Sequence, residues 1–562
     1  MKFLFNNFDI LAESPEGIKK LREMILQFAV QGKLVPQDPN DEHVSVLLKR
    51  IKSEKEQLVK DSKIKKQKEL EPIQQDEIPY EIPHKWKWCR IRSISHDWGQ
   101  KKPDSDFTYI DVTSINKEKG IIGENTQLLD ENSAPSRARK IVKEGTVIYS
   151  TVRPYLLNIA IIGKEYLPEP IVSTAFAIVH PLGKIQNRYL YYYFRSIPFI
   201  NYVESKMIGM AYPAINDTNF FKGLIPIPPL SEQKRILAKV NSLMALCDDL
   251  EKQQQEKAIK KLTLNKASLH TLYNSTTKQD FNKNWNHITN NFNLLYSTPE
   301  NVKELKQTVL QLAVQGKLVP QDPRDEPASV LLAKIRVEKE RLVKEGKIKN
   351  QKPLETIKAD EIPFELPKGW ELSRLQEAID VRDGTHDSPK DAIGKDTYPI
   401  VTSKNFYNGT IKFDEARQIS AEDHNNISKR SFVEPYDILF SMIGGNLGNQ
   451  VMVTDDRPFS IKNVALFKYY NRNLTSPFFI KKFMEHLALD LQSKAAGGAQ
   501  PFVSLGFLRK LIIAIPPIKE QNRIVDKVDS LMDLCDRLSL NLKNKEIING
   551  KMLNSILNKV VS

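Results

Sequence analysis

AVQGKLVPQDP occupies residues Ala29–Pro39, and the same eleven residues return at Ala313–Pro323. An identical stretch of this length does not recur by chance, so the sequence indicates a duplicated segment. At an offset of 284 the match extends upstream, where Asn6–Leu21 aligns with Asn290–Leu305. Downstream it fades near a tryptophan that both copies carry, Trp86 in the first and Trp370 in the second.

A second matched block follows at an offset of 288. It pairs IPPLSEQKRILAKVNSLMALCDDL (Ile227–Leu250) with IPPIKEQNRIVDKVDSLMDLCDRL (Ile515–Leu538). Between the blocks lie two stretches of nearly equal length and little similarity, about 88–226 and 372–514. We call the matched parts the frame and the unlike parts the modules. The predicted segments are a helical frame at 1–76, module 1 at 77–228, a central long helix at 229–273, a polar connection at 274–289, the second frame copy at 290–360, module 2 at 361–516 and a C-terminal long helix at 517–562.

The first part of each frame copy has helix signals. Ser14-Pro15-Glu16 and Thr298-Pro299-Glu300 each offer an N-cap hydroxyl, a proline for the first turn and an acid for the helix dipole. Gly32 and Gly316 are expected to be left-handed C-terminal caps. A second helix is expected through VLLKRIKSEKEQLV and VLLAKIRVEKERLV, where apolar residues recur at helical spacing.

After each module a Pro-Pro pair precedes a long amphipathic pattern. Its apolar residues step by four and three, which is typical of a coiled-coil seam: Ile236, Val240, Leu243, Cys247 and Leu250, and Ile524, Val528, Leu531, Cys535 and Leu538. An amphipathic helix packed on its own domain is the alternative. Because two like halves usually pack around a two-fold axis, we expect antiparallel long helices that hold the modules apart. The asparagine-rich segment between the halves lacks the seam and is expected to be a surface connection.

Each module is predicted to be α+β, so the expected fold is two α/β domains separated by long antiparallel coiled-coil helices with pseudo-two-fold duplication. TVIYSTV (Thr146–Val152) and DILFSMI (Asp437–Ile443) are predicted to be buried strands. YIDVTSIN and YPIVTSKN match through a shared V-T-S, and GMAYPAIN matches GGAQPFVS. The modules are therefore expected to share a fold outline while their polar residues differ.

Composition and motifs narrow the function. The formal net charge of +14 favours an anionic partner. Because no Lys/Arg-rich amphipathic helix with a Trp/Phe/Leu face stands out, nucleic acid is a better candidate than a membrane. Three cysteines suit a reducing cytoplasm, and we expect the two at matching points of the duplication, Cys247 and Cys535, to be buried. The N-terminus does not have a secretion-signal pattern. No GxxxxGK[ST], HExxH, GxGxxG or HxE…PCxxC motif occurs, nor the target-base grip of amino-methyltransferases. The only Pro-Asp pair lacks a following nuclease motif. We therefore expect no catalytic site and no metal site in this chain.

One stretch, DGTHDSP (Asp383–Pro389), resembles a site. Asp383, His386 and Asp387 could bind a metal, but Asp, Gly, Ser and Pro together are more typical of a turn. Loops rich in Thr, Ser, Asn, Gln and His suit the reading of base edges, and a basic surface suits phosphates. The candidate DNA contacts in module 1 are Thr113, Ser114, Asn116, Arg153, Tyr155, Tyr212 and Asn216. Those in module 2 are Thr385, His386, Thr402, Ser403, Lys404, Asn405, Asn446 and Gln500.

The whole chain resembles the specificity subunit of type I restriction–modification enzymes. The resemblance rests on six blocks and on their order along the chain: AVQGKLVPQDP, IPPLSEQKRI, AVQGKLVPQDP again, VRDGTHDSP, DILFSMIGG and IPPIKEQNRI. It differs from shorter members in its added N-terminal segment and its asparagine-rich connection.

The resemblance implies a non-catalytic, cytoplasmic bacterial or archaeal protein. Each module would be a target recognition domain that reads half of a split site in double-stranded DNA, and the coiled coil would set the spacer. The partners would be two methylation subunits and two restriction subunits. S-adenosylmethionine, ATP and Mg²⁺ would be used by those partners, and no cofactor would bind to this chain. The alternatives from the sequence are a self-contained restriction enzyme or methyltransferase, and a coiled-coil scaffold whose modules bind protein.

Overall fold

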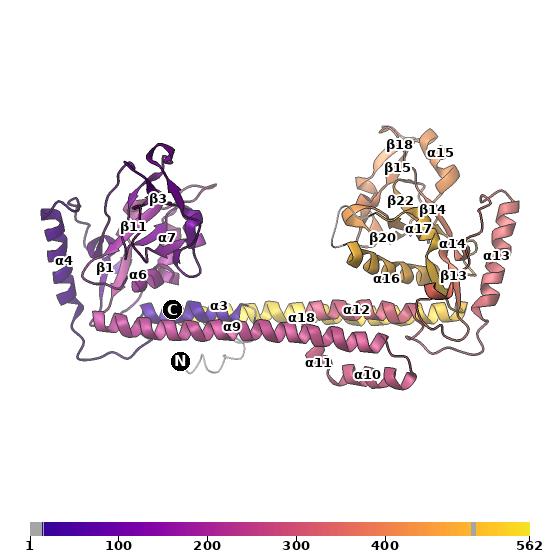
Figure 1. The fold of residues 1–562 in the computed structure, drawn as a ribbon, viewed down its shortest axis with the longest axis horizontal. Coiled ribbons are helices and arrows are strands. Elements are labelled where there is room, and N and C mark those ends of the chain that lie inside the picture. The colour runs from indigo at the N-terminus through magenta and orange to yellow at the C-terminus, as the bar shows by residue number, and fades with distance from the viewer. Residues whose placement is uncertain (1–13, 15, 496–501, 562) are drawn as a thin grey trace. The chain divides into compact units, whose positions relative to one another are not determined.

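The computed structural model describes residue 14, residues 16–495 and residues 502–561, and the chain forms two compact units (Figure 1). Unit 1 combines Met1–Lys257 with Glu546–Ser562, and unit 2 is Ala258–Lys545. Each unit therefore contains the start of one long helix and the end of the other. These helices are α9 (Leu230–Tyr273) and α18 (Ile518–Val561), and this distribution is the one that antiparallel helices produce. Among the described residues, no helix combines the length and the apolar run that crossing a bilayer requires.

The frame is helical, as predicted. Its first copy contains α3 (Gly17–Val30) and α4 (Val44–Lys60), and its second contains α12 (Pro299–Val314) and α13 (Ala328–Lys344). The predicted hydroxyl caps do not form: α3 begins after Glu16, and the Thr298 side chain makes no capping hydrogen bond at α12.

The expected polar connection is itself mostly helical. It contains α10 (Lys278–Asn290), followed by α11 (Phe292–Leu295). Thr277 caps α10 by accepting from the Asp280 amide at 3.1 Å. Ile288 and Phe281 pack in one apolar cluster with Leu269 of α9 and Cys535 of α18. A sparse apolar stripe is enough to hold this helix because the end of α9 and the start of α18 offer an apolar surface.

Each AVQGKLVPQDP segment ends a helix and then turns sharply. Gly32 and Gly316 have φ values of 70° and 68°, in the left-handed region that favours glycine. In the first copy the Lys33 amide donates to the Phe28 carbonyl at 2.9 Å, which closes a Schellman motif, and the second copy has the same bond. The predicted left-handed caps are confirmed.

A buried glutamate at the start of each long helix joins the frame to its module. The Glu232 carboxylate accepts from Trp86 Nε1 at 2.8 Å and from Gln37 Nε2 at 2.5 Å. In the second copy Glu520 Oε1 accepts from the Trp370 indole and from the Gln321 amide group, both at 3.1 Å. We call these two sets of three residues the carboxylate clamps. Burial raises the pKa of both glutamates, and the hydrogen bonds that each accepts oppose that rise.

The residue after each glutamate extends the connection into the module. Gln233 Oε1 accepts a hydrogen bond from the backbone N–H of Gln186 at 3.0 Å. Gln186 is the residue immediately before α6 (Asn187–Phe194). Gln521 Oε1 accepts from the Ser476 amide at 2.9 Å, immediately before α16 (Pro477–Ala495). The Glu-Gln pair that recurs in both copies is thus the joint between the long helix, the repeated loop and the module.

Module 1 is α+β. Its strands are β1 (Lys87–Arg90), β2 (Ser95–His96), β3 (Phe107–Ile110), β4 (Ile115–Asn116), β5 (Ile121–Ile122), β6 (Gln127–Leu129), β7 (Ala138–Ile141), β8 (Val147–Ser150), β9 (Ile159–Ile161), β10 (Pro170–Ser173), β11 (Phe176–Pro181) and β12 (Leu224–Ile227). Its other helices are α5 (Ile91–Ile94), α7 (Ile197–Ser205) and α8 (Asp217–Lys222). The strand orders are β2-β11-β8-β9-β5-β4, β6-β3-β10-β7 and β1-β12.

Module 2 has a related outline. Its strands are β13 (Glu371–Arg374), β14 (Asp380–Asp383), β15 (Thr397–Val401), β16 (Phe406–Tyr407), β17 (Thr410–Ile411), β18 (Arg417–Ser420), β19 (Ile438–Ser441), β20 (Gln450–Met452), β21 (Ser460–Ile461), β22 (Val464–Lys468) and β23 (Ile512–Ile515). Its other helices are α14 (Leu375–Ala378), α15 (Ala421–Ser431) and α17 (Leu505–Lys510). The strand orders are β14-β22-β19-β20, β18-β15-β21, β13-β23 and β16-β17. The predicted buried strands are confirmed as β8 and β19, each buried along its whole length.

The two ends of each module lie side by side. β1 pairs antiparallel with β12, with Lys87 opposite Ile227, and β13 pairs with β23, with Glu371 opposite Ile515. A module therefore leaves the frame and returns to it at one point. The rest of its sequence is free to vary without displacing the frame.

The seam is buried at Ile236, Val240, Cys247, Ile524, Val528 and Cys535 and half-buried at its four leucines, and its start packs on its own half of the chain. Ile236 and Val240 belong to the same core cluster as Ile25 of α3 and Tyr189 of module 1. Cys247 and Cys535 are buried, as expected, and so is Cys89, whose pKa desolvation raises to about 12. The start of each long helix therefore also serves as the base of its module.

We predict that Gly316→Ala destabilises the protein more than Gly346→Ala. Both glycines have left-handed φ, 68° and 70°, so both substitutions cost roughly 1–2 kcal/mol of backbone strain. A Cβ at Gly316 would also lie 2.5 Å from Pro367 Cγ and 2.8 Å from Trp370 Cζ2, whereas nothing lies within 4 Å of one at Gly346. Overpacking adds about 1–3 kcal/mol. Thermal unfolding of the full chain measures the difference, and equal midpoints would contradict this account of the cap.

Candidate nucleic-acid interface

The alignment of the two modules by their shared V-T-S differs by two residues from the alignment of their strands. β3 ends at Ile110 and β15 ends at Val401, so equivalent residues differ by 291 in number, and β8 and β19 give the same difference. The two V-T-S sequences differ by 289. Each strand leads into one turn of 3-10 helix, capped by Asp111 in module 1 and by Thr402 in module 2. Aspartate and threonine both supply a side-chain oxygen that caps the turn, so both modules form the same turn with different residues.

Within this turn the predicted residues divide into buried and exposed ones. Ser114 and its equivalent Asn405 are buried, at 2% and 6% exposure. Ser114 Oγ donates to the Asn125 carbonyl at 2.9 Å, and Asn405 Oδ1 accepts from the Thr402 amide at 2.9 Å. Their polar atoms complete the turn. Its exposed side chains are Thr113 and Lys404, with Ser403 half-buried between Thr402 and Lys404.

Three predicted residues of module 1 gather around a strained backbone position. Arg153 has φ 47°, although it is not glycine, and its equivalent in module 2 is Gly444. Its guanidinium lies 4.6 Å from the ring centre of Tyr212, and its amide donates to the Pro213 carbonyl at 2.8 Å. Tyr155 follows on the 3-10 helix Pro154–Leu156 and is exposed. A left-handed arginine costs energy, and Arg153 is one of seven non-glycine residues with positive φ among the described residues.

The loop that carries Tyr212 also presents apolar residues that the sequence reasoning missed. Met210 is fully exposed and Ile208 is 70% exposed, on a loop closed by a bridge between Ile208 and Ala214. In the sequence only Gly209 and Pro213 indicate a loop here. The exposure of Met210 and Ile208 depends on what packs against them, and the local sequence does not contain that information. The two predicted asparagines nearby have structural bonds: Asn216 Oδ1 caps α8 through the Asn219 amide, and Asn116 Oδ1 accepts from the Lys119 amide.

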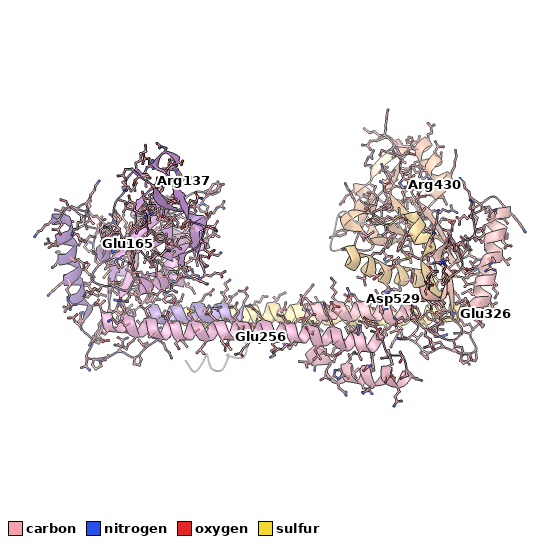
Figure 2. The ribbon with its side chains drawn as sticks, viewed as in Figure 1. Arg137, Glu165, Glu256, Glu326, Arg430 and Asp529 are labelled. Atoms are coloured by element: carbon pink, nitrogen blue, oxygen red, sulfur yellow. The ribbon has the colours of Figure 1, made fainter. Side chains whose placement is uncertain are left out.

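In module 2 the DGTHDSP segment is a loop held by a buried carboxylate. Asp383 is 6% exposed and accepts from His386 Nε2 at 3.0 Å. It also pairs with Arg430 of α15, labelled in Figure 2. The other imidazole nitrogen of His386 lies 3.1 Å from Asn463 Oδ1. Thr385 Oγ1 accepts from the Asp387 amide at 3.1 Å, so the turn interpretation agrees with the geometry. In the described part of the chain no group of three or more His, Cys, Asp or Glu side chains is placed to share a metal ion.

Lys462 brings two predicted groups together. It pairs with Thr385 in a parallel bridge, and its amide donates to the Val401 carbonyl at 2.9 Å. The DGTHDSP loop and the Thr402 turn therefore lie next to each other. Asn446 is exposed on a separate 3-10 helix, Gly444–Asn446, and Gln500 lies outside the described residues. Hydroxyl, amide, imidazole and ammonium groups at one surface are suited to hydrogen bonding with base edges and phosphates.

We predict that Asp383→Asn loosens module 2, whereas His386→Ala does not. The substitution removes the charge that pairs with Arg430 and one acceptor that His386 contacts, which costs about 1–3 kcal/mol for a buried acceptor of a charged donor. His386 is exposed, so its loss should change stability by less than about 0.5 kcal/mol. Amide hydrogen exchange of β14 and β22 in the full chain measures local opening. Unchanged exchange in the Asp383 variant would contradict the anchoring role.

The chain is similar to known proteins over most of its length. The family described as the type I restriction modification DNA specificity domain matches twice, at residues 92–261 and 367–547. The type I restriction enzyme EcoAI specificity subunit from Escherichia coli is 35% identical, over 94% of this chain and 91% of the relative. The EcoEI specificity subunit from the same species is 33% identical, with the same coverage. Among solved structures, the HsdS subunit from Thermoanaerobacter tengcongensis has 23% identity and a TM-score of 0.44, over 86% of this chain and 98% of that one. This chain therefore belongs to the family of non-catalytic specificity subunits of type I restriction–modification enzymes.

Proposed function

We propose that this chain selects the DNA site for a type I restriction–modification complex by reading double-stranded DNA with its two modules. Each module reads one half of a bipartite site. Because the exposed polar residues of the modules differ, the two half-sites differ and the target is asymmetric. The observation that carries the proposal is the contrast between matched clamps and unlike exposed loops: the two copies keep the same joint and present different side chains.

The long helices α9 and α18 set the spacer between the half-sites in this proposal. The chain also recruits two methylation subunits and two restriction subunits, which methylate adenine at N6 or cleave the DNA. S-adenosylmethionine, ATP and Mg²⁺ act in those partners. The antiparallel distribution of the long helices between the units supports a common scaffold for two partners of each kind.

At the level of residues, eight of the predicted side chains are proposed to contact DNA. Six of them are exposed, namely Thr113, Tyr155, Tyr212, His386, Lys404 and Asn446, and two are half-buried, Arg153 in module 1 and Thr385 in module 2. Arg153 is the strongest candidate in module 1, since its strained backbone holds a guanidinium at the surface. Arginine pairs with two acceptors of guanine in the major groove.

Exchange of module 1 tests independent reading. Residues 88–226 are replaced by the corresponding residues of a relative with a different target, in a cell that carries the partner subunits. We expect the methylated adenines, mapped across the genome, to mark a site changed in one half only. A change in both halves would refute independent reading, and the absence of any site-specific methylation from the unmodified chain would refute the proposed function.

Single substitutions provide a matched control for the exchange. Arg153→Gly removes the guanidinium where the other module already has glycine, and His386→Ala removes an exposed imidazole. The first should relax only the half read by module 1, and the second only the other half. Each pair of base hydrogen bonds that is removed corresponds to about 1–3 kcal/mol of discrimination.

Shortening both long helices tests the spacer. Removal of one heptad from each, residues 251–257 and 543–549, shortens a helix by about 10 Å at roughly 1.5 Å per residue. Since base pairs are spaced about 3.4 Å apart, the gap between methylated adenines should shrink by about 3 base pairs, or binding should be lost. An unchanged gap would show that the coil does not set the spacing.

A further inference from the structure

The positive charge of the chain is concentrated in two matched segments of the frame. Residues 44–68 contain nine lysines and arginines against three acids, and residues 328–352 contain eight against three. They carry +6 and +5 of the formal net charge of +14. We call them basic arm 1 and basic arm 2. The modules and the long helices together carry +9, but spread over a far longer stretch of sequence, so the density of positive charge is highest on the arms and the arms are the strongest candidates to meet the anionic partner that composition indicates.

Each arm is fixed to its own module. In arm 1, Leu47 and Ile51 of α4 pack so closely on module 1 that a Cβ at Gly183 would lie 2.4 Å from Ile51 Cγ1. Lys55 Nζ donates to the Arg92 and Ser95 carbonyls at 2.6 and 3.1 Å. Burial, and then the nearby Arg92, lowers the pKa of Lys55 to about 8, so this lysine is an anchor.

The second arm is held in the same way. Leu331 and Ile335 of α13 belong to the core of module 2, and Lys339 Nζ lies 2.9 Å from a Glu377 carboxylate oxygen. Figure 1 shows α4 beside module 1 and α13 beside module 2. The charges of each arm are thus displayed from a rigid support at the side of a module.

Many cations of the arms have no acidic partner within the described residues. In arm 1 these exposed side chains are Lys49, Lys52, Lys60, Lys65, Lys66 and Lys68. In arm 2 they are Arg336, Lys344, Lys349 and Lys352. Cations left without carboxylates on a surface favour an anion supplied from outside.

The duplication indicates which anion this is. The arms are matched between the copies, whereas the exposed loops of the modules are not. Two different half-sites of DNA share no bases, but they share the phosphate backbone. An element kept the same in both copies fits the part of DNA that is the same at both half-sites.

We propose that the two basic arms bind the DNA phosphate backbone beside each half-site, as a grip that is independent of sequence. This inference rests on the proposed function. It assigns the affinity for DNA and the recognition of its bases to different parts of the chain. The arms supply electrostatic attraction, and the loops of the modules supply base recognition. Phosphate contacts position a protein on DNA without carrying sequence information.

The test neutralises arm 1 in the full chain by six substitutions, Lys49, Lys52, Lys60, Lys65, Lys66 and Lys68 to Gln. Binding is measured against salt concentration with a duplex that carries the mapped site and with one in which that site is scrambled. We expect weaker binding to both duplexes by the same factor. The slope of log K against log salt should fall by up to about 5, at about 0.9 for each phosphate that the arm no longer neutralises.

Two control proteins make the result specific. Six exposed lysines outside the arms, Lys252, Lys278, Lys283, Lys303, Lys519 and Lys527, are changed to Gln and should leave the slope unaltered. The six arm lysines changed to Arg keep their charge and should keep the slope, which separates charge from folding.

The remaining outcomes are distinguishable. An unchanged slope with intact site-specific binding would overturn the arm proposal and leave the proposed function standing, as would weakened assembly with the partner subunits at an unchanged slope. A loss of discrimination between the two duplexes would also overturn it, because the arms would then read bases. Failure of the unmodified chain to prefer its site would refute the proposed function itself.

Discussion

The structure depends on a carboxylate buried where three parts of the chain meet. Glu232 and Glu520 are almost inaccessible, at 0% and 1% exposure, and each is satisfied by an indole and an amide from elsewhere in its own half. A buried carboxylate without partners is costly, so the tryptophan, the glutamine and the glutamate are required together. This explains why AVQGKLVPQDP recurs unchanged: its glycine makes the turn, and its glutamine completes the clamp.

A module attached at one point is free to diverge. The pairing of β1 with β12 and of β13 with β23 returns the chain to the clamp after each module. Loops away from that joint carry little of the core, so their side chains can change with small cost. Arg153 and Gly444 occupy equivalent positions with similar backbone and unrelated side chains, which illustrates this freedom.

The distribution of charge follows the same division. The arms belong to the frame and resemble one another, and the loops belong to the modules and differ. In the scheme proposed above, general attraction to DNA stays constant while recognition changes. Helices α4 and α13 use one apolar stripe to hold the module and leave the opposite face to lysine and arginine, so one amphipathic helix performs both tasks.

The sequence alone determined the duplication, the helical frame, the glycine caps, the two buried strands and the family. These follow from periodicity, turn chemistry and repeated blocks, which are local or compare one segment with another. Tertiary structure decided the rest. It paired Asp383 with Arg430, 47 positions away, and it buried Ser114 and Asn405 within a turn. It also showed that equivalent strand residues of the two modules differ by 291 in number, which the shared V-T-S did not predict. Whether a polar side chain closes a turn or faces solvent depends on what packs against it, and a periodic pattern does not contain that information.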